Sequence, residues 1–250
     1  MNKKIILGIT ALLCAATIFA APVKIDGYNW LDIAVADDGT ILACNTTGDM
    51  YVSSDKGASF TKVEGYDAVR VSMNSTGTMM AHVNQKGDLY YSTDRGQSWT
   101  KSNAYNIMDV CATRSVHFTV NLSGEVYESR DMMNWTKTKI NNEIRAVFDG
   151  WKLVTISRDN GEAYVHAYKS AQDMTSYKTA SYDFVDLDVD PDGMIFCVNK
   201  AGDVYTAPNK AEEGLAFTKD EDVYNVIAIS ASRKYIATVN KEGNAYLETR

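Results

Sequence analysis

Apolar and polar residues alternate along most of the chain with a period of two. This is the periodicity of β-strands that have one covered face, whereas a helix would place apolar residues three and four positions apart. The pattern is clearest over residues 66–105, where short turn clusters of Gly, Asn, Asp or Ser separate four expected strands, at 69–74, 79–84, 88–92 and 99–104. Turn residues at such places indicate hairpins, so this segment predicts a four-stranded antiparallel sheet.

The same pattern recurs along the chain, marked each time by Gly, a residue that is usually acidic, any residue and then Tyr. Six copies begin at Gly48, Gly87, Gly124, Gly161, Gly202 and Gly243, with spacings of 39, 37, 37, 41 and 41 residues. A period near 40 that contains only strands is typical of β-propeller blades, which must stack and close into a ring to cover their faces. The sequence therefore predicts an all-β fold: one six-bladed β-propeller of four-stranded antiparallel blades over residues 21–250.

The two ends of the chain supply one blade together. The sixth unit ends at Arg250, directly after its third strand, while residues 23–28 match the fourth-strand segments 61–66 and 100–105. We therefore expect the N-terminal strand to complete the last blade. The matching segments share a lysine on the outermost strand, where it discourages pairing with another molecule; the six copies are Lys24, Lys62, Lys101, Lys137, Lys178 and Lys219.

The first residues have the pattern of a secretory signal peptide over residues 1–20. Lys3 and Lys4 precede the uncharged apolar stretch 5–19, and the small pair Ala20 and Ala21 follows it. The protein is expected to be exported, to the periplasm or the outside, with no membrane insertion. Cleavage would leave 23 basic and 32 acidic residues and a net charge of −9. A protein this acidic is a poor candidate for binding nucleic acid or an anionic membrane.

The reactive side chains form no catalytic or metal-binding motif. An odd number of cysteines survives processing, each in an apolar strand pattern, so we expect buried free thiols at Cys44, Cys111 and Cys197. The histidines lie in different units without ligand spacing, so no metal site and no cofactor is expected from His82, His117 and His166. The acidic stretch 186–193 alternates like a strand and ends in a Pro-Asp-Gly turn, which favours strand and turn over a calcium loop.

Two family resemblances follow from the motifs. Segments 53–60 and 92–99 resemble the Asp-box, Ser-x-Asp-x-Gly-x-x-aromatic, of sialidase-type propellers, and Ser129, Asp131 and Trp135 form a shorter third copy. The layout of residues 30–51, which recurs with losses over nearly all of 22–250, resembles the tectonin family. That resemblance implies a six-bladed lectin for sugars or bacterial surface glycans, although most units here lack the family's initial Trp.

Aligned units turn equivalent positions into rings around the axis. The first-strand ring alternates in charge sign until its sixth member: Asp32, Arg70, Asp109, Arg145, Asp186 and Ile227. Because first strands run close together near the axis, we expect Asp32 to pair with Arg70, and Arg145 to pair with both Asp109 and Asp186. A sialidase-like site would instead use these arginines together with Arg158. The chain shows no N-terminal arginine signature of that family, so this reading ranks last.

Two further rings of equivalent residues lie on one face of the predicted propeller. The turn after the second strand gives Asn45, Asn84, Asn121, Arg158, Asn199 and Asn240. The turn before the first strand gives Tyr28, Tyr66, Tyr105, Asn141, Tyr182 and Tyr224. Aromatic planes beside amides suit a shallow sugar site, although Asn also serves turns and Tyr also packs between blades. The sequence thus favours a non-catalytic carbohydrate-binding propeller over a protein-binding scaffold or assembly factor, and both over a sialidase-like hydrolase.

Overall fold

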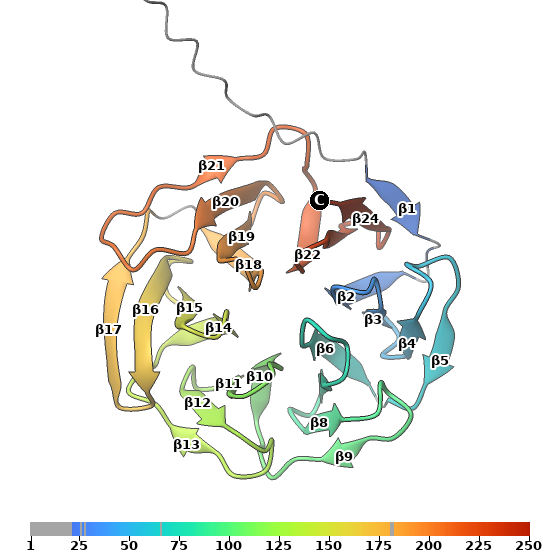
Figure 1. The fold of residues 1–250 in the computed structure, drawn as a ribbon, viewed down its shortest axis with the longest axis horizontal. Helices are drawn as coiled ribbons and strands as arrows, with labels where there is room; N and C mark the ends of the chain where they lie inside the picture. Colours follow the sequence, from blue (N-terminus) through green and yellow to red (C-terminus); the bar gives the residue numbers. More distant parts are fainter. Residues whose placement is uncertain (1–21, 26, 28, 66, 181–182) are drawn as a thin grey trace, which may run out of the picture.

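The computed structural model describes residues 22–25, 27, 29–65, 67–180 and 183–250. The predicted signal peptide 1–20 and the ring members Tyr28, Tyr66 and Tyr182 lie outside the described residues. Six sheets of four antiparallel strands surround a central axis (Figure 1). The all-β six-bladed propeller is confirmed, and nothing in the described ranges forms a helix able to cross a bilayer.

Five blades use four consecutive strands each, numbered outward from the axis. Blade 1 contains β2 (Trp30–Val35), β3 (Ile41–Asn45), β4 (Met50–Ser53) and β5 (Thr61–Val63); blade 2 contains β6 (Ala68–Met73), β7 (Met80–Asn84), β8 (Leu89–Ser92) and β9 (Thr100–Lys101). Blade 3 contains β10 (Ile107–Cys111), β11 (His117–Asn121), β12 (Val126–Ser129) and β13 (Thr136–Lys137); blade 4 contains β14 (Glu143–Phe148), β15 (Lys152–Ser157), β16 (Ala163–Ser170) and β17 (Asp173–Lys178). Blade 5 contains β18 (Phe184–Val189), β19 (Met194–Asn199), β20 (Val204–Pro208) and β21 (Thr218–Lys219).

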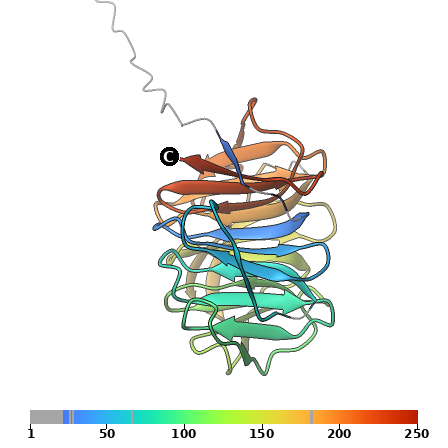
Figure 2. The same ribbon diagram turned by 90° about the vertical axis from the view of Figure 1, so that its right-hand side faces the viewer.

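Blade 6 joins the two ends of the chain. It contains β22 (Val226–Ala231), β23 (Tyr235–Asn240) and β24 (Ala245–Thr249), and its outermost strand is β1 (Val23–Ile25). Strand β1 pairs antiparallel with β24, with Lys24 opposite Tyr246. The end of β24 and the start of β1 therefore lie side by side in both views of the ring (Figures 1 and 2). The predicted closure by the N-terminal strand is confirmed.

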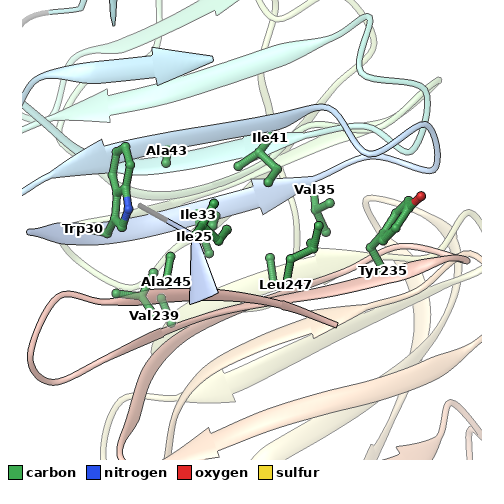
Figure 3. Close-up of a cluster of buried hydrophobic side chains, with 12 residues drawn as sticks. Ile25, Trp30, Ile33, Val35, Ile41, Ala43, Tyr235, Val239, Ala245 and Leu247 are labelled. Carbon is green, nitrogen blue, oxygen red and sulfur yellow. The ribbon is translucent and has the colours of Figure 1, made fainter. Parts of the chain in front are cut away.

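The junction between blades 6 and 1 has an aromatic core (Figure 3). Trp30 is fully buried there, with its ring centroid 4.9 Å from that of Phe60 and 5.5 Å from that of Tyr51. Ile25 of β1 and Leu247 of β24 cover the same cluster from blade 6. Burial of such side chains on both sheets stabilises the closed ring, because each sheet alone would leave its face in water.

The glycine of the repeat is required by contact between blades. A residue with positive φ precedes the first strand of every blade: Asn29, Asp67, Asn106, Asn142, Asp183 and Asn225. Asn and Asp tolerate this conformation better than other non-glycine residues. It brings the backbone so close to the preceding blade that a Cβ on Gly48 would lie 2.5 Å from the Cα of Asp67. The N–H of Ala68 donates to the carbonyl of Gly48 at 3.0 Å, and the same contact recurs around the ring.

The two Ser-Asp turn segments, residues 53–60 and 92–99, hold the connection between the third and fourth strands. Ser53 Oγ donates to Asp55 Oδ1 at 2.7 Å and accepts the N–H of Gly57 at 2.8 Å. Asp55 accepts the N–H and hydroxyl of Ser59, and these bonds lower the pKa of Asp55 to about 2. Segment 92–99 makes the same bonds. The serine and aspartate thus satisfy the turn's own amides.

The outer-strand lysines pair within their own blades. Lys62 Nζ lies 2.8 Å from Asp49, the acidic residue that follows the repeat glycine, and Lys101 lies 2.9 Å from Asp88. Lys137, Lys178 and Lys219 make the equivalent pairs. Pairs this exposed contribute little to stability.

Cys44, Cys111 and Cys197 are buried free thiols, as the sequence predicts.

Candidate functional site

The predicted charge pairs form at the axis. Arg70 lies 3.4 Å from Asp32, and Arg145 lies 3.9 Å from Asp109 and 2.9 Å from Asp186. We call these five side chains the axial collar. Arg70 also reaches 3.4 Å from Asp109 and 2.7 Å from Asp186, which belongs to the opposite blade. The collar is therefore a network across the axis rather than a ring of neighbouring pairs.

One member of the predicted ring is wrong. Each first strand contains a β-bulge after its first residue, and in blade 6 the register shifts between Val226 and Ala228. Ile227 is the bulge residue, so its equivalent in blade 1 is Leu31 and not Asp32. Ala228 occupies the collar position of blade 6. The collar thus has two arginines and three aspartates, with a small apolar residue in the sixth place.

The collar aspartates also link neighbouring blades. Asp32 Oδ2 accepts the N–H of Val71 at 2.8 Å, and Asp109 Oδ2 accepts the N–H of Ala146 at 3.0 Å. Burial raises the pKa of Asp32 to about 6, against the lowering effect of Arg70. Burial acts on Asp186 in the same direction, but Arg70 and Arg145 outweigh it and hold the pKa of Asp186 below its usual value.

The predicted asparagine ring serves the turns. Asn45 Oδ1 accepts the N–H groups of Thr47 and Asp49, at 3.1 and 2.9 Å. Equivalent pairs of backbone bonds are made by Asn84, Asn121, Asn199 and Asn240. Arg158, the sixth member, donates instead to Met108 Sδ at 3.4 Å. The amide oxygens of this ring are committed to the backbone.

The tyrosine ring is open to solvent where the structure describes it. Tyr105 is 75% exposed and Tyr224 is 72% exposed, and Asn141 is exposed as well. These side chains precede first strands, so they stand on the same face as the asparagine turns. The structure thus places exposed tyrosines beside asparagines whose oxygens already accept two hydrogen bonds each.

The opposite face carries a funnel that the sequence did not reveal. A cavity of 410 Å³ runs from Asp32 and Arg70 of the collar to the turns that connect first and second strands. Asp188 lines it, and burial raises the pKa of Asp188 to about 7 although the N–H of Ala231 donates to its carboxylate. The collar forms the inner end of this funnel.

Trp151 stands at the mouth of the funnel and is 80% exposed. It lies at the tip of the β14–β15 turn, where Asp149 Oδ1 accepts the N–H groups of both Trp151 and Lys152. Asp149 Oδ2 also accepts a bond from Asn209 Nδ2 of blade 5, at 2.7 Å. A sequence signal was present, because none of the equivalent turns of the other units contains an aromatic residue.

Comparison with known proteins supports the fold. No family model and no curated protein matches the chain. Among solved structures, YCF48 from Cyanidioschyzon merolae matches with a TM-score of 0.60 and 14% identity, over 92% of this chain and 85% of that chain. YCF48 bound to D1 peptide gives 0.57 and 13%, over 88% and 76%. A chain of the mitotic checkpoint complex gives 0.64 and 11%, over 98% of both chains. Identities this low show a β-propeller fold alone.

Proposed function

We propose that this protein is an exported, non-catalytic propeller that binds a protein partner at the mouth of the axial funnel. The observation that carries the proposal is Trp151, a large aromatic side chain that is 80% exposed on a turn braced by Asp149. Trp is among the residues most enriched at binding hot spots, where a rigid anchor limits the entropy lost on binding.

The funnel offers polar partners next to this anchor. Asp188 faces the cavity, and the exposed Arg114 stands on the neighbouring turn of blade 3. An apolar anchor ringed by charged groups is the usual anatomy of a protein interface. Two similar structures support this class of function: YCF48 is solved bound to D1 peptide, and another similar chain is part of the mitotic checkpoint complex.

The lectin hypothesis remains the second candidate. The exposed Tyr105 and Tyr224 favour it, since an aromatic face can stack on a sugar ring. The asparagines that were expected to complete the site accept backbone bonds instead, which removes the acceptor oxygens expected to contact sugar hydroxyls. This difference is why protein binding ranks first.

The test presents the exported protein to a random peptide library and to a glycan array in parallel. We expect the library to yield binders whose affinity falls at least tenfold in Trp151→Ala. Tyr105→Ala is the matched control, because Tyr105 is equally exposed on the opposite face. Glycan hits that Tyr105→Ala weakens, with no enriched peptide, would overturn the proposal in favour of a lectin. Mass spectrometry of the exported protein's N-terminus tests the predicted cleavage.

A further inference from the structure

A second cavity lies between blades 5 and 6, away from Trp151. Its volume is 580 Å³, within the range of about 300 to 1,000 Å³ typical of ligand sites. Phe196 and Val204 line it from blade 5, and Ile236 and Tyr246 line it from blade 6. We call it the 5–6 groove. Pro22, the residue before β1, is also part of its wall.

Most other blade junctions are filled at this place by an aromatic residue two positions before the outer-strand lysine. The residues are Phe60, Trp99, Trp135 and Phe217, each packed against the cluster that joins its own blade to the preceding one. Blade 4 has Ser176 at this position, but Met174 and Tyr168 of its long hairpin pack into the junction instead. The aromatic residue follows the turn between third and fourth strands, so it is delivered by that turn.

Blade 6, whose fourth strand comes from the other end of the chain, lacks this filling residue. Counting back two residues from Lys24 gives Pro22, which is exposed. The buried cluster between blades 5 and 6 is the smallest of the six, with six buried members against seven to twelve elsewhere in the described residues. The 5–6 groove is therefore the space that a Phe or Trp occupies at other junctions.

The second strand of blade 6 is also more exposed to solvent than the second strand of blade 1. In β3, the residues that face the preceding blade, Ile41 and Ala43, are fully buried. The equivalent residues of β23, Ile236 and Thr238, are partly exposed and line the groove. A partly uncovered apolar strand face inside a propeller is a surface that a partner side chain can cover with a gain in buried area.

The rim of the groove is acidic. Asp220 and Asp222 lie on one wall and Glu242 and Glu248 on the other, whereas the one basic residue of the lining, Arg250, is paired with Asp190. Burial raises the pKa of Glu248, with Asp220 adding to the effect. A cation placed here would relieve this repulsion between carboxylates, so the rim selects a positively charged occupant.

We propose that the 5–6 groove is a second docking site, which takes an extended segment of a partner protein carrying a Phe or Trp next to Lys or Arg. The aromatic ring would fill the position that Phe60 fills at the closing junction, and the basic residue would face Glu248 and Asp220. The proposal does not depend on the funnel, since Trp151 is not part of this groove.

The chain itself supplies the probe: a fluorescent peptide with the sequence of residues 53–62, which contains Phe60 between Lys56 and Lys62. We expect fluorescence polarisation to show binding that falls at least tenfold when the probe's Phe is replaced by Ala, and that weakens in high salt. Thr238→Phe and Pro22→Phe fill the groove from the protein side and should abolish binding. Trp151→Ala should leave it unchanged, so this test fails or succeeds separately from that of the funnel.

Three results would overturn the proposal. Equal binding of the Phe and Ala probes would show that no aromatic pocket exists. Dimers that Thr238→Phe dissociates, measured by light scattering, would assign the groove to a second copy of this chain. A mature protein that retains residues 1–21 gives a third possible result. If the probe binds this protein only after residues 1–21 are removed, the groove belongs to the chain's own N-terminus. Circular dichroism of Thr238→Phe and Pro22→Phe checks that each variant folds.

Discussion

Replacing Asp186 by Ala removes the acceptor at the centre of the axial collar. Asp186 Oδ1 accepts bonds from Arg70 Nη2 at 2.7 Å and Arg145 Nε at 2.9 Å, and Oδ2 accepts the N–H of Ile229 at 3.0 Å. The substitution therefore leaves two largely buried guanidinium groups and one backbone donor without their shortest bonds. It breaks contacts that join blade 5 to blades 2, 4 and 6 at once.

The expected loss is about 3 to 5 kcal/mol of unfolding free energy, the usual range for removing one partner of a buried ion pair. The sum of the three bonds would be larger, at about 1.5 to 3 kcal/mol for each charged one. Asp32 and Asp109 remain within 3.4 Å of Arg70, and their attraction to Arg70 offsets part of the lost free energy. Asp109→Ala should cost less, about 1 to 4 kcal/mol, because its distances to Arg70 and Arg145 are longer.

Urea unfolding followed by tryptophan fluorescence measures both variants, since Trp30 is fully buried in the closing core. With an m-value of about 3 kcal/mol/M, the Asp186→Ala midpoint should fall by about 1 to 1.7 M. Lys62→Ala is the control, because the Lys62–Asp49 pair is exposed and its loss should leave the midpoint nearly unchanged. An Asp186→Ala midpoint equal to that of wild type would refute the reasoning that these side chains form a buried network.

Three other predictions concern the ring and its titration. Gly48→Ala should lower the unfolding free energy by about 2 to 4 kcal/mol, because the added Cβ would clash with Asp67. Gly214→Ala is the control, since Gly214 also has a positive φ but open space around it, and it should cost about 1 kcal/mol. Urea unfolding measures both variants. Burial raises the pKa values of Asp188 and Glu143 to about 7, so the stability linked to their protonated forms is lost as pH rises through 7. Unfolding free energy should therefore fall between about pH 4, near the pKa values of the unfolded chain, and about pH 7, and level off above that; Asp188→Asn should flatten that fall. A chain that begins at residue 29 lacks β1 and should aggregate through the bare edge of β24; cooperative melting at the full-length temperature would contradict closure.

The blades could be predicted because the repeated residues meet structural requirements that are the same in every blade. The contact between neighbouring blades needs the glycine, and a strand needs alternation, so each unit shows the same residues wherever it lies in the ring. The pairing of Asp32 with Arg70 followed from the same alignment, since neighbouring blades place equivalent residues side by side. Alignment could not show that Arg70 reaches Asp186, because that contact crosses the axis. The alignment was also one residue out in blade 6, where it assigned the bulge residue Ile227 to the collar position that Ala228 occupies.

The asparagine ring shows why a repeated polar residue is weak evidence for a binding site. Asn45 recurs because its Oδ1 accepts two backbone N–H groups of the turn that follows, a local need present in each unit. Residues that serve a partner have no reason to recur, and Trp151 does not. In a repeat protein, function is therefore better sought at positions where one unit departs from the others.

The 5–6 groove follows from this argument and was within reach of the sequence. The match between residues 23–28 and 61–66 identified the closing strand. Extending this alignment by one residue towards the N-terminus makes Pro22 the equivalent of Phe60. The aromatic residue is missing because the equivalent position is Pro22, which precedes β1 and is not held by a turn, since β24 and β1 belong to opposite ends of the chain. What sequence alone could not supply is the partial exposure of Ile236 and Thr238, which shows that no described side chain has moved in to fill the space. A propeller closed in this way keeps one junction open unless its N-terminal segment restores the aromatic side chain, so Pro22→Phe should raise the unfolding midpoint while it abolishes probe binding.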